Sequence, residues 1–335
     1  PLGGFLIDAL DWRAVFWINL PLSVVAIWLA LRYIPESRNE YASGALDWIG
    51  GISAIVAFGA LTGGLTLFSE AQIDPAWAFA MMLLGATVLG YFLFVEARAS
   101  DPLMPLTLFR DRGFSSANIV TVFLYGALTG ILFLLPFDLI ERRGLSATEV
   151  GLTLLPIGVI IGILSRVAGG VADRNGPRLL LVSGSLLVAA SAAILAFTLE
   201  NFWVGVMAPI VLVSLGMAVV VAPLTTAVMN AASEEQSGAA SGVNNAASRL
   251  AALFAVASFG AIATYVFFAS LESGGLTTTG LRFGVFPPAG DPDRPAVEAA
   301  FVSAYSAALW ATALSGLLAA LIALTFLKSD RPHAR

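Results

Sequence analysis

Nine apolar segments of about 20 residues or more constrain this chain more than any other feature, because an α-helix of ~20 residues crosses the roughly 30 Å of hydrocarbon in a bilayer. The whole sequence is 58% apolar and 12% charged, with a mean hydropathy of +0.88. Soluble domains carry about a quarter charged residues. We therefore predict an all-α membrane protein. The expected spans are Ala14–Tyr33, Leu46–Phe68, Ala76–Val95, Ser115–Pro136, Val150–Ala168, Pro177–Leu199, Phe202–Met229, Gly238–Ala269 and Val297–Leu327.

Charge and composition exclude several other kinds of function. The net charge of −5 argues against nucleic acid as a partner, since nucleic-acid binding needs a clustered basic face. Cysteine is absent, which excludes disulfides, thiolate catalysis and cysteine-ligated metals. The single histidine, His333, lies in the polar tail at 328–335. No span holds a histidine or a pair of acids that an intramembrane hydrolase would need. We predict neither enzymatic activity nor a bound metal or cofactor.

Basic residues in the loops predict the orientation of the spans. With alternating crossings, ten lysines and arginines fall on the side that holds the C-terminus and five fall on the other. This bias places the C-terminus in the cytoplasm. Two polar connections on that side, Ile34–Ala45 and Glu96–Arg112, bracket a pair of spans, so we interpret this pair as a hairpin inserted between two larger bundles. Pro1 to about Ala9 reads as the stub of one more helix.

A connection between two spans carries the most informative motif. Gly169, Asp173, Arg174, Gly176 and Arg178 have the spacing Gly-x-x-x-Asp-Arg-x-Gly-x-Arg on the predicted cytoplasmic side. Small residues let a membrane helix approach its neighbour closely, and arginines can reach headgroups or a carboxylate. A cytoplasmic loop explains the arginines alone, but it does not explain the whole spacing.

This loop resembles the signature loop of the major facilitator superfamily, in its second-bundle copy. Pro1, Gly3 and Gly4 resemble the end of the antiporter motif on the fifth helix of its EmrB/QacA-type drug:proton antiporters. Other stretches similar to that family are Trp12-Arg13, Phe16-Trp17-Ile18-Asn19-Leu20-Pro21, Pro223-Leu224-Thr225-Thr226 and Ser241-Gly242-Val243-Asn244-Asn245 with Arg249. The family usually has a glycine pair where Ala251-Ala252 stand here, so this helix contact is expected to be looser.

The resemblance implies a partial fourteen-helix fold with a helix-five stub and nine transmembrane helices. Residues 1–34 would end the N-terminal bundle, 35–112 would carry two linker helices, 113–327 would form the six-helix C-terminal bundle, and 328–335 would be a cytoplasmic tail. Helices one to four are expected to belong to the same protein but to be missing here. The implied function is proton-coupled efflux of drugs or amphipathic molecules from the cytoplasmic membrane by alternating access, powered by a proton gradient. Two alternatives stay open, a transporter of another solute and a non-transporting scaffold.

Several polar residues inside or beside the spans could line a translocation path. Arg166 and Arg249 lie within spans, where an unpaired charge must face protein or water. Arg166 could instead reach the inner headgroups. Ser233 and Gln236 read as a capping box, which would place Arg249 about 24 Å along its helix.

That helix also carries a polar stripe, formed by Ser237, Ser241, Asn244 and Ser248. Asn245 lies one turn before Arg249. The stripe could line a cavity or join helices by hydrogen bonds. Asp138 is the best available proton carrier, although a helix-end residue at the outer surface is the simpler interpretation. Pro1, Gly3 and Gly4 could seal one face of an antiporter or form an ordinary helix contact.

Overall fold

The computed structural model describes residues 1–34, 47–67, 74–99, 102–198, 200–233, 236–276 and 280–327, and these residues form helices joined by turns and loops. Nine helical segments of this described part are long and apolar enough to span a membrane. The predicted all-α membrane fold is confirmed. The helices are α1 (Leu2–Ala9), α2 (Ala14–Trp17), α3 (Asn19–Tyr33), α4 (Trp48–Leu67), α5 (Pro75–Glu96), η1 (Leu106–Arg110), α6 (Arg112–Phe137), η2 (Asp138–Arg142), α7 (Ala147–Thr153), α8 (Leu155–Asn175), α9 (Arg178–Ala196), η3 (Trp203–Met207), α10 (Ala208–Asn230), α11 (Ser237–Ser273) and α12 (Arg294–Phe326).

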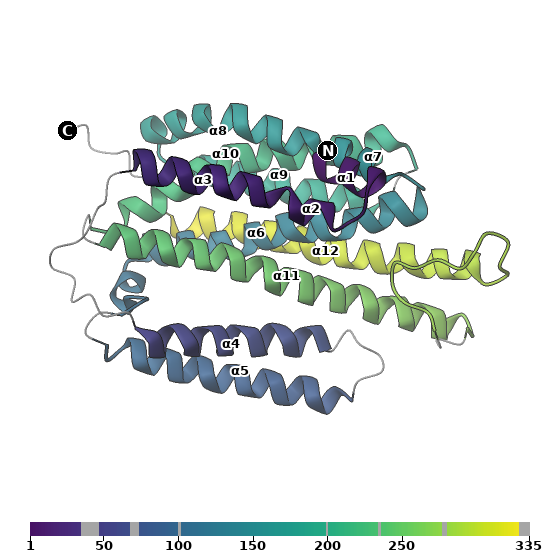
Figure 1. Ribbon diagram of the computed structural model, residues 1–335, viewed down its shortest axis with the longest axis horizontal. Coiled ribbons are helices and arrows are strands. Elements are labelled where there is room, and N and C mark those ends of the chain that lie inside the picture. Colours follow the sequence, from purple (N-terminus) through teal and green to yellow (C-terminus); the bar gives the residue numbers. More distant parts are fainter. Residues whose placement is uncertain are drawn as a thin grey trace.

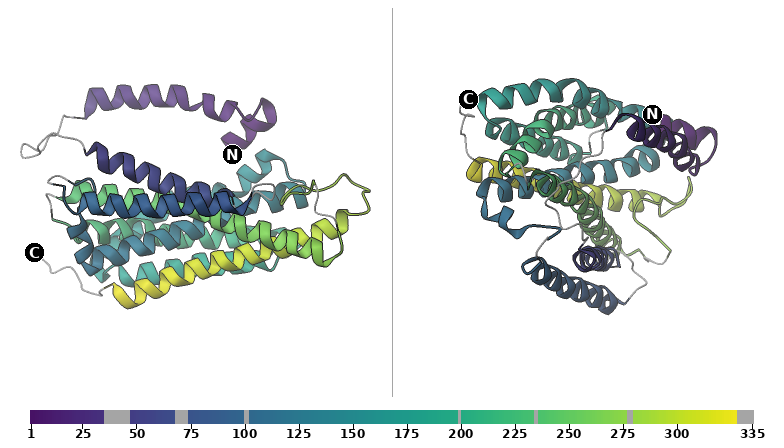
Figure 2. Two further views of the ribbon diagram at one scale, coloured as in Figure 1. Left: turned by 90° about the horizontal axis from the view of Figure 1, so that it is seen from below. Right: turned by 60° about the vertical axis from the view of Figure 1, so that its left-hand side comes forward.

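The long helices run side by side along one direction (Figure 1). α6 and α8 to α12 pack against one another, whereas α4 and α5 pair on one flank and reach the other helices mainly through α11. Figure 2 shows α1 to α3 on a different flank from this pair. α3 buries none of its residues, so its apolar side chains, such as Leu31 at 84% exposure, are suited to contact with lipid or another helix.

The core lies where α6, α9, α10, α11 and α12 meet. Its fully buried side chains include Leu124 and Ile131 on α6, Met217 on α10 and Tyr305 on α12. In a bilayer the association of helices depends on close packing, since lipid tails are as apolar as leucine. Gly130 of α6 provides such packing, because a Cβ added there would lie 2.7 Å from both the Phe259 ring and the Thr312 hydroxyl.

The pair formed by α4 and α5 uses the same principle. A Cβ on Gly64 of α4 would lie 2.9 Å from the carbonyl oxygen of Ala78, and one on Gly85 of α5 would lie 2.9 Å from that of Ala57. The helix backbones therefore touch at two glycines. Asp74 caps α5 by accepting a hydrogen bond from the Ala76 N–H at 2.9 Å, and Pro75 occupies the first turn.

The observed helix ends differ from the expected ones in two informative places. α6 begins at Arg112, because the Asp111 side chain accepts from the Phe114 N–H at 2.8 Å. The expected span at Val150–Ala168 begins three residues earlier, with a capping box formed by Ser146 and Glu149, and it is broken at Leu154. Leu199 and the tail at 328–335, with His333, fall outside the described residues.

The capping box predicted for Ser233 and Gln236 is wrong. α11 begins at Ser237, and its N-cap Gln236 makes no side-chain capping bond. The Gln236 N–H instead donates to the Ser233 carbonyl oxygen at 3.0 Å, so the turn is closed by backbone groups. Arg249 is therefore twelve residues into α11, at a depth of about 18 Å rather than about 24 Å.

Candidate functional site

The signature loop forms a tight turn between α8 and α9. α8 ends at Asn175, and the Gly176 N–H donates to the Ala172 carbonyl oxygen at 2.8 Å. Gly176 has a φ of +82°, a conformation that glycine adopts without a steric penalty. Arg178 opens α9, and its guanidinium donates to the carbonyl oxygen of Leu324. That carbonyl lies in the last turn of α12, where helix carbonyls lack partners within the helix.

The other signature residues lie on α8. Gly169 faces α10, where the Ala222 methyl group would contact an added Cβ at 3.5 Å. Arg166 and Arg174 are exposed, and no described residue forms an ion pair with either. Asp173 belongs to the last turn of α8, and its side chain lies outside the described part of the structure. The described geometry assigns the loop one firm contact, from Arg178 to α12.

The stretch from Pro1 to Gly4 packs against α7. A Cβ on Gly4 would clash with the Ala147 carbonyl oxygen, and one on Gly151 would lie 2.9 Å from the Pro1 Cα. Gly3 has more room, with Val15 at 4.0 Å. α1 and α7 therefore meet backbone to backbone, a contact that larger residues at positions 4 and 151 would prevent.

Asp8 strengthens this contact, a role that was not predicted from the sequence. Its carboxylate accepts hydrogen bonds from the Thr148 N–H at 2.7 Å and the Ala147 N–H at 3.2 Å. Asp8 lies outside the nine membrane-length segments. The pKa of its carboxyl is below the usual value, because the Thr148 side chain and backbone donate hydrogen bonds to the ionised form. An acid at the end of an apolar stub is the signal that could have identified it.

The polar stripe of α11 contacts α6 through Asn244. The Asn244 amide donates to Thr121 Oγ1 at 2.8 Å and to Asn118 Oδ1 at 3.2 Å. Both partners are buried on α6. Neither partner was predicted, although polar residues three apart in an apolar span could have suggested a helix contact. These bonds join two helices, which is one of the two interpretations of the stripe.

Two polar side chains that follow Asn244 on α11 bond within their own helix. The Asn245 amide donates to the Ser241 carbonyl oxygen at 3.1 Å, and the Ser248 hydroxyl donates to the Asn245 carbonyl oxygen at 2.8 Å. Ser241 is half-buried and Asn245 is exposed. Their side chains remain available for contacts other than those with α6.

Two cavities lie between α11 and the α4–α5 pair. One has a volume of about 850 Å³, and its lining includes Phe58, Thr62, Met81 and Leu253. The other has a volume of about 940 Å³ and lies nearer η1 and α6; its lining includes Phe92, Met104, Asn118, Gly242 and Phe254. Phe58, Ala54, Ala246 and Leu250 line both, so the two cavities adjoin. Their walls are mainly apolar.

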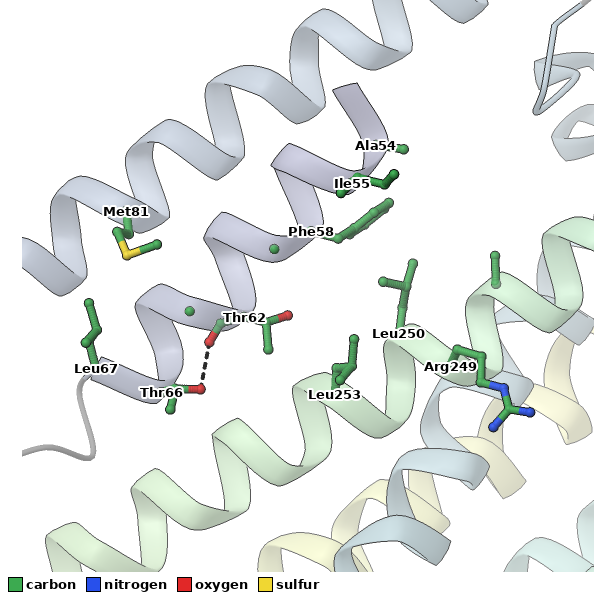
Figure 3. A pocket seen from close by; sticks show the side chains of 13 residues that line it. Ala54, Ile55, Phe58, Thr62, Thr66, Leu67, Met81, Arg249, Leu250 and Leu253 are labelled. Carbon is green, nitrogen blue, oxygen red and sulfur yellow. Dashed lines mark hydrogen bonds between the residues drawn. The ribbon is translucent and has the colours of Figure 1, made fainter. Parts of the chain in front are cut away.

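Arg249 lies at the edge of the first cavity. Figure 3 shows Leu250 and Leu253 directed from α11 toward α4, whereas the Arg249 guanidinium points away from α4. Arg249 is exposed. No described carboxylate forms an ion pair with Arg249. A cation at this depth costs about 2.5–3.5 kcal/mol in a lipid-facing position, so it is expected to face protein or water.

Asp138 is held by two arginines where α6 continues into η2. Its carboxylate accepts from Arg142 Nε and from Arg143 Nε, the latter at 2.8 Å, and its side chain is 3% exposed. Arg142 also pairs with Glu200 at 2.8 Å, and Arg143 donates to the Glu200 carbonyl oxygen at 3.0 Å. The sequence placed Asp138 at the end of its span but did not indicate this network. Both carboxylate oxygens are engaged, so protonation requires release from the arginines.

The described side chains contain no cluster of three or more His, Asp or Glu residues that could hold a metal ion. The chemistry available is therefore helix contact, cation placement beside an apolar cavity, and protonation of buried carboxylates.

The family model described as Major Facilitator Superfamily matches residues 1–256. The multidrug resistance protein Stp of Mycobacterium tuberculosis is 30% identical over 271 residues, which are 81% of this chain and 50% of the relative. The tetracenomycin C resistance and export protein of Streptomyces glaucescens is 30% identical over 363 residues, covering 100% of this chain and 66% of the relative. The chain thus spans only about half to two thirds of these relatives' length.

A solved structure shares the fold at low sequence identity. A bacterial homologue of the human lysosomal transporter Spinster, in an inward-facing and occupied conformation, aligns with a TM-score of 0.54 and 18% identity. The alignment covers 82% of this chain and 64% of that chain.

Proposed function

Because this chain belongs to the major facilitator superfamily, we propose that it is part of a secondary transporter that exports apolar or amphipathic small molecules by alternating access, in exchange for protons. The fold is a multi-pass, all-helical membrane fold, and members of this family are transporters rather than enzymes. The efflux direction is supported by the multidrug and antibiotic resistance proteins of similar sequence.

One observation carries the proposal: Arg249 stands inside a membrane-length helix, unpaired by the described carboxylates, at the edge of a mainly apolar cavity. Apolar walls with few placed polar groups are typical of small-molecule sites. A cation in the membrane is a functional residue by default because of its cost. In this proposal the cavity holds the apolar substrate, and Arg249, whose guanidinium points away from α4, contacts a coupling carboxylate on its other side.

We further propose the EmrB/QacA-type fourteen-helix subtype. The α4–α5 pair occupies the chain between α3 and α6, where this subtype carries its two extra helices. The division into an N-terminal bundle end, a linker pair, a C-terminal bundle and a cytoplasmic tail follows from this assignment. The excess of basic residues on one side favours a cytoplasmic C-terminus in the cell's inner membrane.

Proton coupling requires a carboxyl group that is exposed to the two sides in turn. Asp138 can serve only in a state in which Arg142 and Arg143 release it, since both hold it here. The main proton carrier is expected in helices one to four of the same protein. The cytoplasmic signature loop would stabilise one conformation through the contact of Arg178 with α12.

The experiment measures dye transport by inside-out membrane vesicles that contain the protein encoded by the whole reading frame to which this chain belongs. We expect the dye to accumulate in the vesicles only when a proton gradient is present. The rate of accumulation should fall at least tenfold in Arg249→Ala. Thr325→Ala on α12 is the control, because Thr325 is exposed and its hydroxyl bonds only its own helix. Equal transport by Arg249→Ala and the parent protein, or transport that persists after the gradient is collapsed, would contradict the proposal.

A further inference from the structure

Two acids lie together at one end of the α4–α5 pair, where α4 begins and α5 ends. The proposed export function uses neither of them. Asp47 directly precedes α4, and its Oδ1 accepts from the Gly50 N–H at 2.7 Å. Glu96 is the last residue of α5, and its Oε2 accepts from the Met104 N–H at 2.9 Å. Each acid thus has one oxygen fixed by a backbone N–H.

The second oxygen of each acid has no hydrogen-bond partner. Asp47 Oδ2 and Glu96 Oε1 are both buried and unpaired. Both face the space above Gly50, since an added Cβ there would overlap Asp47 Oδ2 and lie 2.7 Å from Glu96 Oε1. Glu96 is 3% exposed as a whole residue. The structure therefore aims two orphan carboxyl oxygens at one small, enclosed space.

No described cation neutralises the pair. Arg98 stacks its guanidinium on the Phe94 ring at 3.7 Å. Arg110 lies on η1 and Arg112 at the start of α6, and neither forms an ion pair with the two acids. The carboxylate of Asp111 accepts from the Phe114 N–H. The first turns of α11 carry no charged residue before Arg249.

Two ionised carboxylates that share a buried site repel each other, and an unpaired buried acceptor loses the hydrogen bonds that it would make in water. One proton removes both penalties, because the O–H of one acid can then donate to the oxygen of the other. Paired carboxyl groups that hold a single proton are a known arrangement in proteins. A backbone N–H already fixes each acid, so the remaining two oxygens are the ones that can share it.

We propose that Asp47 and Glu96 form a proton-binding site in which one shared proton ties together the cytoplasmic ends of α4 and α5. Loss of that proton leaves two facing charges and separates the two ends. The site also reaches the cavity of about 940 Å³. Met104, which donates to Glu96, lines that cavity together with Leu103 and Phe92. Protonation therefore sets the position of one cavity wall. This inference does not depend on which substrate the transporter carries.

Infrared spectroscopy of the full chain in lipid vesicles tests the shared proton directly. At pH 7 free carboxyl groups, whose pKa values are near about 4, are ionised. We expect one protonated-carboxyl band per chain, which is lost in both Asp47→Asn and Glu96→Gln because the acid that remains is then ionised. Asp74→Asn is the matched control; it removes an exposed acid from the other end of the same helix pair and retains a capping side chain, so the band should remain.

A distance measurement tests the consequence for the helices. The sequence has no cysteine, so spin labels at Ile49→Cys and Leu93→Cys would be the only ones, and both positions are exposed. We expect the distance between α4 and α5 to increase as rising pH removes the shared proton. Glu96→Gln should keep the short distance at every pH, because its amide can donate to Asp47 as the shared proton did.

Three results would overturn the proposal. The first is the absence of the band from the parent chain, or its survival in either acid variant. The second is a label distance that does not change with pH in the parent chain, or that still changes in Glu96→Gln. The third is a band or distance that responds to sodium or potassium at constant pH, which would make the site a cation site. Monodisperse elution of each variant in detergent shows that it has folded.

Discussion

On one side α11 packs against α6, and on the other side it approaches α4, and the two contacts differ in construction. The contact with α6 is dense and hydrogen-bonded, with Asn244 joined to Thr121 and Phe259 set against Gly130. The contact with α4 leaves two adjoining cavities of about 850 and 940 Å³. One helix therefore serves as a fixed element of the bundle on one side and as a wall of a binding space on the other.

This difference shows how one membrane helix can contribute stability through one face and line a ligand-sized cavity with the other. Interhelical hydrogen bonds and small-residue contacts hold membrane helices together. Cavities reduce packing, so they are tolerated where the neighbouring helix gains stability elsewhere. Here α4 is held by α5 through Gly64 and Gly85 and does not need a tight contact with α11.

The largest expected effect is that of a methyl group added on the dense side. Gly130→Ala places a Cβ 2.7 Å from Phe259 and Thr312, so we expect a loss of about 1–3 kcal/mol from overpacking, measured as lowered resistance to unfolding in detergent. Gly59→Ala on α4 is the control, because no atom lies within 4 Å of its added Cβ. It should be neutral or slightly stabilising, since alanine favours helix over glycine. Equal behaviour of the two variants would remove the distinction between the two sides.

The next effect is that of the polar tie itself. Asn244→Ala removes the bonds to Asn118 and Thr121, and we expect a loss of about 1 kcal/mol, in the range of interhelical hydrogen bonds in membranes. The unfolding equilibrium in detergent is the measurement. Asn245→Ala, which loses only a bond to its own helix, should change stability less. A larger loss for Asn245→Ala than for Asn244→Ala would show that the polar stripe acts elsewhere.

The sequence predicts the helices well, because span length is set by the bilayer and apolar composition reports it directly. Nine spans were expected and nine membrane-length segments are found in the described residues. The turn at Gly176 was also predictable, since a positive φ favours glycine. The kind of neighbour that each face of α11 meets was only partly predictable. The polar stripe indicated a cavity or a helix contact, but the apolar remainder of the helix gives little indication of which side packs.

Two local features were not predicted. The break at Leu154 falls inside the expected span Val150–Ala168, where Pro156 in the first turn of α8 is a local signal for it. The π-helical turn of η2 lies beyond the expected span end at Pro136, and composition gives little indication of such a turn. Asp138 illustrates this limit, since its arginine partners follow four and five residues later and are placed by the π-helical turn. The depth of Arg249 was overestimated because the capping box was assigned from residue types alone.

A third variant addresses the open side of α11. Leu253→Trp enlarges a side chain that points into the cavity toward α4, so we expect stability to change by less than about 0.5 kcal/mol. Binding of an apolar fluorescent probe by the full chain should weaken several-fold because the space is filled. Phe259→Trp on the dense side is the matched variant, and it should destabilise without weakening probe binding. Destabilisation by Leu253→Trp of the same size would mean that the cavity side is also closely packed.

The smallest expected effect concerns the exposed hydrogen bonds of Asp8. Comparing them with the buried hydrogen bonds of Asn244 separates the contribution of burial from that of hydrogen bonding. Asp8 links two helices by hydrogen bonds, as Asn244 does, but Asp8 is exposed to solvent. It accepts from the N–H groups of Ala147 and Thr148.

The pKa of Asp8 is lowered in the folded chain by the Thr148 bonds. The contact between α1 and α7 is therefore fully present above the ordinary carboxyl pKa and is lost as pH falls through the pKa of the folded chain. Crosslinking of cysteines placed at Leu2 and Leu152, which follow the touching residues Pro1 and Gly151 and are exposed, should therefore decline at acidic pH in the parent chain, whereas Asp8→Asn should show a lower yield that does not depend on pH. If solvent screening makes exposed ties negligible, the two proteins will crosslink equally at neutral pH, and burial alone will account for the strength of the Asn244 contact.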